Sequence, residues 1–197
     1  MQYTSETIEE MVAYFASLPS VGRKTAQRLT YFLLKREKDF VHKFADTMKK
    51  LKDNVQYCSQ CNNYTETDPC PICASETRQK HVICVVEEPN DVLAIEKTNE
   101  FKGLYHVLHG LINPLDGVSP QDIKLQELIQ RLGSVEELIF ALDASVEGEI
   151  TMQYISKIVR PLDIKMTRLA RGMPIGGELE FTDDATIARA FESRVIL

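Results

Sequence analysis

The sequence predicts a multi-part α/β protein, with helices in its first quarter and a parallel sheet in the larger remainder. Residues 1–52 show apolar positions at helical spacing and many basic side chains, and four cysteines gather in the polar segment that follows. From residue 81 on, short apolar runs rich in β-branched side chains alternate with helical patterns. Because buried strands that alternate with helices form βαβ units, this part predicts a parallel sheet.

The chain is long enough, at 197 residues, for one or two domains with hydrophobic cores. No apolar run reaches the roughly 18 residues needed to span a membrane, and the acidic, polar start is unlike a signal peptide. We therefore expect a cytoplasmic protein with no membrane partner. The four parts expected are a helical module at 1–53, a four-cysteine segment at 54–80, an α/β domain at 81–172 and a C-terminal segment at 173–197.

The helical module is expected to hold three helices separated by short breaks. Thr7 is a candidate N-cap for the first helix, and Pro19 and Gly22 interrupt the pattern before the second. The helices are predicted at about 8–17, 23–34 and 38–52.

The α/β domain is predicted from four apolar runs and the helical patterns between them. Strands are expected at 81–87, 104–109, 137–142 and 164–169. Helices are expected at about 90–97, 121–132, 147–160 and, near the C-terminus, 183–193. Residues 110–120 are too rich in Gly and Pro for either, and a loop of that length inside a compact unit is usually functional.

The four cysteines of the polar segment have the spacing of a metal site. Two Cys-x-x-Cys turns supply Cys58, Cys61, Cys70 and Cys73, which complete a tetrahedral shell with no vacancy for water. The alternatives are a redox pair or two unrelated pairs, but redox pairs open a helix after a strand, and neither pair is predicted to do so. We expect one structural zinc ion, which stabilises a segment with few apolar residues of its own. Cys84, inside the first strand, is expected to be a small buried hydrophobe.

Basic charge is concentrated near the N-terminus of an acidic chain. The net charge is −6, yet residues 1–52 carry ten Lys and Arg against six Asp and Glu, and residues 21–52 carry ten against three. Such a segment is either an electrostatic footprint for phosphates or a solvated helix face. Charge alone does not separate these two readings.

The turn before the second helix adds weight to the phosphate reading. Gly22 is expected to let the backbone bend and to let a ligand approach closely. The free N–H groups of the helix start favour an anion, and Arg23, Lys24 and Arg28 lie beside them. The alternative is an ordinary αα-hairpin with a glycine turn, but the surplus of basic charge favours sequence-independent, salt-sensitive DNA binding. A P-loop is rejected, because Ser17 replaces its first glycine and no strand precedes it.

Acidic side chains follow the predicted strands. Glu87 and Glu88 end the first strand, Asp143 ends the third, and Glu147 and Glu149 open the next helix. Ligands collect at the carboxyl ends of strands in an open α/β sheet, where clustered carboxylates can bind Mg²⁺ and support phosphoryl transfer. The alternative is that the last two simply favour a helix N-terminus.

Several segments, taken together and in order, resemble the bacterial recombination mediator family RecR. They are LPSVGRKTAQRL, the four cysteines, VVEEPNDVLAIEKT, FKGLYHVLHG, VEGE and RGMPIGGELEF, and they span nearly the whole chain. The resemblance implies a helix-hairpin-helix, a four-cysteine zinc finger, a Toprim domain and a C-terminal segment. It also implies a ring-like homo-oligomer, a tetramer, that encircles DNA. The resemblance places the protein in the cytoplasm, on the nucleoid when it is bound to DNA. It implies that the protein acts with RecO, RecF or both to help load RecA onto DNA coated by single-strand-binding protein. Members of this family are mediators and not enzymes.

The same resemblance bears on the acidic residues. Catalytic Toprim domains bind Mg²⁺ with a Glu and a DxD pair; Glu87 and Asp143 match the first two positions, but Ser145 stands at the third. Glu147 could compensate, so these acids are a possible vestigial Mg²⁺ or partner site. The alternative function is a Mg²⁺-dependent nuclease or topoisomerase-like enzyme. The C-terminal LEFTDD is similar to a Walker B motif, but without a Walker A partner it predicts no hydrolysis.

Overall fold

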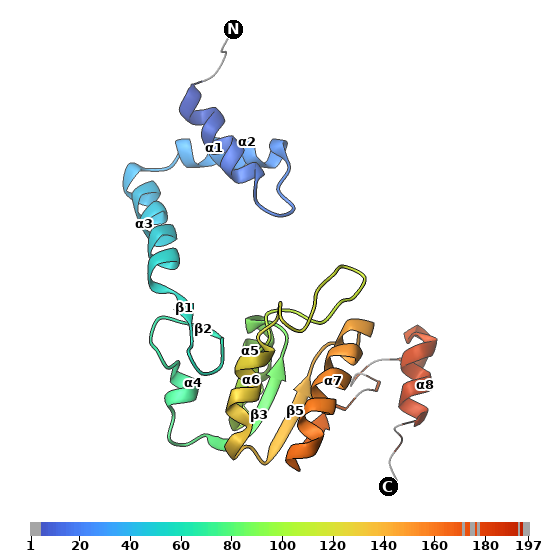
Figure 1. Ribbon diagram of the computed structural model, residues 1–197. Helices are drawn as coiled ribbons and strands as arrows, with labels where there is room; N and C mark the ends of the chain where they lie inside the picture. The colour runs from blue at the N-terminus through green and yellow to red at the C-terminus, as the bar shows by residue number, and fades with distance from the viewer. Residues whose placement is uncertain (1–4, 171, 174–175, 177, 193, 195–197) are drawn as a thin grey trace. The chain divides into compact units, whose positions relative to one another are not determined.

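The computed structural model divides the chain into two compact units, residues 1–55 and 56–197, which are described separately (Figure 1). The residues that the structure describes are 5–170, 172–173, 176, 178–192 and 194. Parts of the expected segment RGMPIGGELEF and the last residue of the helix expected at 183–193 lie outside them, namely Arg171, Pro174, Ile175, Gly177 and Ser193. None of the described helices is long and apolar enough to span a membrane.

The first unit consists of the three predicted helices. They are α1 (Glu6–Ala16), α2 (Arg23–Leu34) and α3 (Lys38–Asn54). The first begins earlier than expected, because Ser5 rather than Thr7 occupies the N-cap position. The buried residues of this unit are Val12 of α1 and Ala26 and Thr30 of α2, and within the described chain α3 contributes no buried residue. The unit therefore has a very small core.

The second unit contains the predicted parallel sheet, so the α/β class is confirmed. Its strand order is β4-β3-β5-β6, and all neighbouring pairs are parallel. The strands are β3 (Gln79–Val86), β4 (Gly103–Val107), β5 (Glu137–Ala141) and β6 (Lys165–Arg168). The connecting helices are α5 (Pro89–Glu96), α6 (Leu125–Arg131) and α7 (Val146–Val159).

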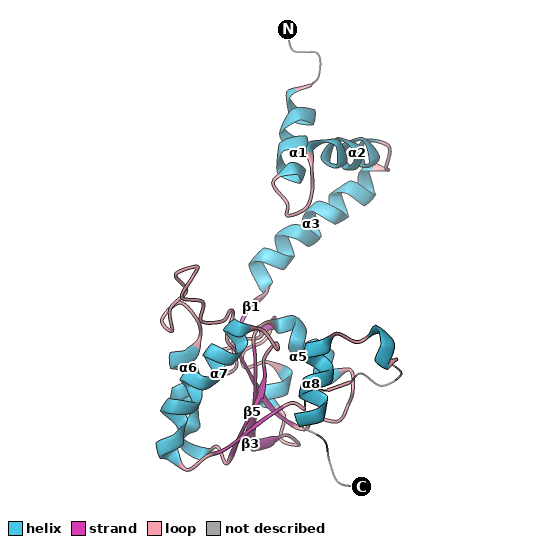
Figure 2. Cartoon of the chain, turned by 90° about the vertical axis from the view of Figure 1, so that its right-hand side faces the viewer, coloured by secondary structure: helices cyan, strands magenta, loops and turns pink. Residues whose placement is uncertain are grey.

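Helices cover both faces of this sheet. Figure 2 shows α6 and α7 on one side of the strands and α5 on the other. Ile83 and Val85 of β3 belong to the larger apolar cluster with α6 and α7, whereas Cys84 and Val86 belong to the smaller cluster with α5. Burial on both faces explains why β3 reads as an almost unbroken apolar run. It also confirms Cys84 as a buried residue, and burial raises the pKa of its thiol to about 12.

The helix predicted at 121–132 begins only at Leu125, and the reason is a tertiary contact. The backbone N–H of Lys124 donates to the carbonyl of Leu108 (2.8 Å), and the carbonyl of Lys124 accepts from His106 Nε2 (2.6 Å). These bonds tie Lys124 to the end of β4 with a non-helical ψ of 44°. The helix then passes into a 3₁₀ turn at Leu132–Ser134.

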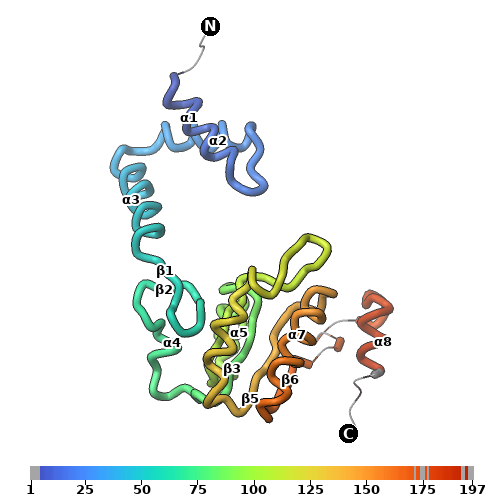
Figure 3. Tube along the Cα trace, in the orientation of Figure 1, coloured from blue at the N-terminus to red at the C-terminus, as the bar shows by residue number. Residues whose placement is uncertain are grey.

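The four-cysteine segment and the C-terminal segment contain short elements that the sequence pattern did not predict. The former holds a hairpin of β1 (Gln56–Tyr57) and β2 (Tyr64–Thr65) and the short helix α4 (Pro71–Ala74), all too short to show periodicity. The tube in Figure 3 shows how this segment leads into β3.

The LEFTDD segment is not a strand, contrary to a Walker B reading. It forms a 3₁₀ turn at Leu179–Phe181, and Asp183 then accepts a hydrogen bond from the backbone N–H of Thr186 (2.9 Å) at the start of α8 (Asp184–Glu192). The apolar side chains of Leu179 and Phe181 are exposed. An acidic residue that caps a helix in this way is structural.

Candidate functional site

The four predicted cysteines lie together in a geometry that fits zinc. All four are buried, and their sulfur atoms lie within 4.8 Å of one another. Around a tetrahedral zinc ion with bonds of about 2.3 Å, sulfur atoms stand about 3.8 Å apart, and Cys61 Sγ lies 3.6 Å from Cys70 Sγ. Among the described residues no other group of three or more His, Cys, Asp or Glu side chains is placed to hold a metal ion.

Backbone groups in the cluster also favour thiolate ligands. The N–H of Cys70 donates to Cys58 Sγ (3.3 Å), and the N–H of Cys73 donates to Cys70 Sγ (3.5 Å). Without a metal ion, the side chains of Cys61 and Cys70 share a hydrogen bond. This hydrogen bond raises the pKa of Cys61 to about 12 and lowers the pKa of Cys70. A bound zinc ion would take the place of the proton in that bond.

The position of the second cysteine pair differs from the prediction. Cys70 is the N-cap of α4, so this pair does open a short helix. The helical turn brings Cys73 back toward Cys70, and all four sulfurs still converge. The cluster therefore supports a metal site rather than a redox pair.

The segment that carries the cysteines, residues 56–74 and called the metal loop from here on, is attached to β4, the edge strand of the sheet. The N–H of Val107 donates to the carbonyl of Cys61 (2.9 Å), and His109 Nε2 donates to the carbonyl of Asn62 (2.6 Å). The His109 ring also packs edge-on against Tyr57 of β1, with 4.7 Å between centroids. The metal loop and the sheet therefore form one structural unit.

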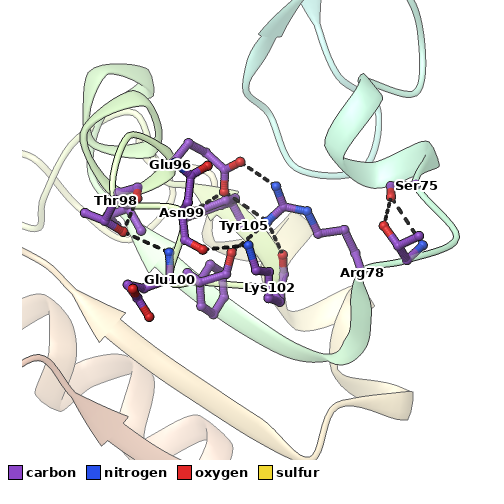
Figure 4. A network of polar contacts seen from close by, with 12 residues as sticks. Ser75, Arg78, Glu96, Thr98, Asn99, Glu100, Lys102 and Tyr105 are labelled. Atoms are coloured by element: carbon purple, nitrogen blue, oxygen red, sulfur yellow. Dashed lines mark hydrogen bonds and ion pairs between the residues drawn. The ribbon is translucent and has the colours of Figure 1, made fainter.

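The FKGLYHVLHG segment contains β4, and several of its residues contact Arg78 and Glu96 outside the segment. Figure 4 shows Glu96 between Arg78 and Tyr105: Arg78 Nη1 and the Tyr105 hydroxyl donate to Glu96 Oε1 over 2.9 Å and 2.7 Å. Arg78 also donates to the carbonyls of Phe101 (3.1 Å) and Gly103 (3.3 Å), and its guanidinium lowers the pKa of Glu96. A Cβ on Gly103 would lie 2.7 Å from the backbone carbonyl oxygen of Val82 and 2.5 Å from the Phe101 ring, so a larger residue would require the backbone to shift.

The basic hairpin is present, but its sharp bend lies elsewhere than expected. Ser20 has the left-handed conformation (φ 63°), whereas Gly22 is extended (φ −77°, ψ 160°). The prediction that Gly22 supplies the bend is therefore wrong. Among the described residues, and apart from the adjoining backbone, no atom lies within 4 Å of where a Cβ on Gly22 would sit. The glycine thus leaves the helix start open to a ligand.

The predicted basic residues lie in the first two turns of the helix that begins at this open start. Gly22 is the N-cap of α2 and has no side chain to bond the first N–H groups. Arg23, Lys24 and Arg28 are all exposed. Arg23 Nη2 forms an ion pair with Glu9 Oε2 (2.7 Å), which partly neutralises it. The arrangement can hold an anion such as a phosphate.

The acidic residues lie at the topological switch point of the sheet. β3 continues into α5 on one face and its neighbour β5 leads into α7 on the other, so ligands are expected between these strand ends. Glu87 directly follows β3, and Asp143 lies just after β5. Both line a hollow of about 350 Å³ with Ser145 and Glu147. Burial, and then the charge of Asp143, raise the pKa of Glu87.

Residues at the start of α7, two of which line this hollow, have structural roles in that helix. Ser145, at the second aspartate position, is the N-cap of α7 and accepts from the N–H of Gly148 (3.0 Å). Glu147 lies in the first turn, as the structural alternative expected. A Cβ on Gly148 would lie 2.2 Å from the carbonyl oxygen of Asp143, so helix and strand end meet closely. Among the described residues, the carboxylates of this hollow do not form a group of three or more ligand atoms close enough to hold a metal ion.

Other structural residues near these sites carried no signal in the sequence pattern. Thr151, fully buried on α7, accepts from the N–H of Ile112 (2.8 Å) and so fixes the start of the 110–120 loop. His106 is buried and accepts at Nδ1 from Arg131 Nη1 (3.0 Å). Burial lowers the pKa of His106 to about 4, so its imidazole is neutral.

Comparison with known proteins agrees with this architecture. The family models that match are the RecR helix-hairpin-helix at 8–52, the RecR four-cysteine zinc finger domain at 55–75, the Toprim domain at 81–170 and the RecR C-terminal segment at 172–195. Proteins named Recombination protein RecR are 56% identical in Chloroherpeton thalassium and 53% identical in Chlorobaculum tepidum, each over 98% of both chains. Another from Clostridium perfringens is 49% identical over 100% of both chains. The chain therefore belongs to the RecR family of recombination proteins.

Proposed function

We propose that this chain is a DNA-binding recombination mediator in recombinational DNA repair. It acts in the cytoplasm with RecO, RecF or both to help load RecA onto DNA coated by single-strand-binding protein. The observation that carries the DNA-binding role is the open start of α2, where Gly22 leaves backbone N–H groups accessible beside exposed Arg23, Lys24 and Arg28. Helix N–H groups and flanking cations hold phosphates without reading bases.

The test removes the three cations together, as Arg23→Gln, Lys24→Gln and Arg28→Gln. If each contacts a phosphate, the negative slope of log affinity against log salt concentration becomes less steep by about 2 to 3, on duplexes of any sequence. Arg23 is expected to contribute least, because it already pairs with Glu9. An unchanged affinity and salt slope would contradict the proposed DNA face.

A matched control separates the hairpin from net charge. Replacing Lys97, Lys157 and Arg160 with Gln removes the same charge from exposed positions of the second unit. DNA binding should then stay close to that of the unsubstituted chain. In a reconstituted reaction with RecO, the hairpin variant alone should lose RecA loading onto coated single strands.

A second candidate function is a Mg²⁺-dependent Toprim nuclease or topoisomerase-like enzyme. The specific observation in its favour is that Glu87 and Asp143 share one hollow at the switch point. Against it, Ser145 serves as a helix cap, and a hydroxyl brings no charge to a Mg²⁺ ion. Incubating supercoiled DNA with the protein and Mg²⁺ or Mn²⁺ decides between them: cleavage that Glu87→Gln abolishes would replace the mediator proposal.

Self-association into a ring tetramer is also proposed. The support is the first unit, whose small core leaves many large apolar side chains exposed. These are Met11, Tyr14, Leu18, Leu29, Tyr31, Phe32, Leu34, Phe40, Phe44, Met48 and Leu51. An apolar hollow of about 350 Å³ lies between its helices, with Met11, Leu33 and Val41 in its lining. A second copy of the chain would remove this surface from water.

Solution mass tests the association. Light scattering should give a tetramer for the unsubstituted chain and a smaller species for Leu34→Asp with Phe44→Asp. Leu115→Asp is the control, because Leu115 is exposed (95%) but lies on the 110–120 loop of the other unit. A monomer at all working concentrations would refute the ring.

A further inference from the structure

Arg131, the last residue of α6, is held against β4 by its guanidinium. Arg131 Nη1 donates to the carbonyl of Tyr105 (2.8 Å) and to His106 Nδ1 (3.0 Å). One residue further along β4, the N–H of Val107 donates to the carbonyl of Cys61. The same short strand therefore touches both the guanidinium and the metal loop.

This guanidinium is partly buried and has no carboxylate partner. Within the described residues, no Asp or Glu oxygen lies within the 4.0 Å ion-pair distance of Arg131. Arg78 is the contrast, since its side chain bonds the carbonyl of Gly103 at the other end of β4 and pairs with Glu96. Removing a cation from water without an opposing charge is costly. Arg131 therefore requires a negative charge from a group other than a carboxylate.

The metal loop is bound to the same part of β4 as this guanidinium, because Arg131 bonds the carbonyl of Tyr105 and the N–H of Val107, two residues further on, bonds the carbonyl of Cys61. Burial lowers the pKa of Arg131, and the charges that oppose this effect are those of Cys73, Cys61, Cys58 and Cys70, in that order. His106 adds no negative charge, because it accepts from Arg131 as a neutral imidazole. Four thiolates around one Zn²⁺ leave two net negative charges on the centre.

We propose that Arg131 is the outer-sphere cation that compensates the negative charge of the zinc–tetracysteine centre. The inference rests on zinc as the occupant of the cysteine cluster. Arg131 lies more than fifty residues from the nearest ligand in sequence, so zinc affinity depends on the folded Toprim sheet. His106 is then a positioning residue, which holds the guanidinium through Nδ1 while Lys124 fixes its other nitrogen.

Zinc affinity of the full-length chain tests this role. For Arg131→Gln, competition with a chelating indicator should show zinc binding weakened by about 10- to 100-fold, as for other outer-sphere partners. Arg131→Lys keeps the charge and should lose less. Arg78→Gln, the matched control, should leave zinc affinity unchanged even though it lowers stability. Cobalt substitution reports the four-sulfur tetrahedral geometry by its visible spectrum, and confirms that each variant still forms the centre.

A thermodynamic cycle distinguishes charge compensation from simple packing. With zinc bound, Arg131→Gln should lower the free energy of unfolding; after chelation the same change should cost less or be stabilising, because the cation then faces protonated thiols. Equal costs with and without zinc would overturn the proposal, as would unchanged zinc affinity in both Arg131 variants. If the unsubstituted chain bound no zinc, the occupant itself would be wrong, which is a separate outcome.

Discussion

Replacing Gly148 with Ala tests the contact on which the acidic hollow is built. At an unconstrained helix position this change should stabilise the protein by about 1 kcal/mol. Here the new Cβ would lie 2.2 Å from the carbonyl oxygen of Asp143, where an ordinary contact begins at 3.4 Å. The obstacle is backbone that follows β5, so the start of α7 must move by about an ångström, a distortion that costs about 1–3 kcal/mol.

That movement would also weaken the Ser145 cap, whose loss costs about 0.5–2 kcal/mol. The two costs exceed the gain in helix propensity, so we expect a net loss of about 1–3 kcal/mol. Urea unfolding of the zinc-loaded chain, followed by circular dichroism, measures it, and faster amide exchange in α7 locates it.

Gly133→Ala is the matched control in the same unit. Among the described residues no atom lies within 4 Å of its added Cβ, and Gly133 does not have a left-handed φ. This change should be neutral or stabilise by about 0.4–1 kcal/mol. If Gly148→Ala were as stable as Gly133→Ala, the close approach of α7 to Asp143 would be incorrect.

Three further changes test other contacts. Thr151→Val leaves the buried N–H of Ile112 without its acceptor and should lower the free energy of unfolding in urea by about 1–3 kcal/mol. Thr30→Val should cost less, because the Thr30 hydroxyl donates to the carbonyl of Ala26 within the same helix. The pKa of His106 is about 4 in the fold against 6.5 ordinarily, so the unfolded chain takes up a proton first as the pH falls. Stability should drop by about 1 kcal/mol between about pH 7 and 5.5, and His106→Gln should flatten this dependence; equal slopes would contradict the burial. Chelating zinc should lower the thermal transition and weaken DNA binding, and no change in either would refute a scaffolding role.

The features predicted well from sequence are those fixed by spacing. The four cysteines converge because two Cys-x-x-Cys turns leave little choice of geometry. The exposed start of α2 and the carboxylates after β3 and β5 followed from helical period and strand ends. Each of these depends on residues that are close in the chain or on a general rule of topology.

The features that sequence missed depend on contacts between distant residues. Lys124 stays out of α6 because its backbone bonds to Leu108 and His106 on β4. No local pattern marks Arg131 as a partly buried cation, because its surroundings come from other elements. Ser145 did carry a local signal, since serine is a favoured N-cap. The hydroxyl that brings no charge to a metal ion is the group that caps α7.

The contacts along β4 have a consequence for the chain outside its folded state. An edge strand offers unpaired backbone groups on which another chain can add a strand. Here Arg78 occupies the carbonyl of Gly103, Arg131 that of Tyr105, and the metal loop the N–H of Val107. Zinc loss would therefore expose the unpaired backbone N–H of Val107 at this end of the edge strand. Zinc depletion is then expected to cause irreversible aggregation before the second unit unfolds. The aggregation would be measured as turbidity that rises with protein concentration.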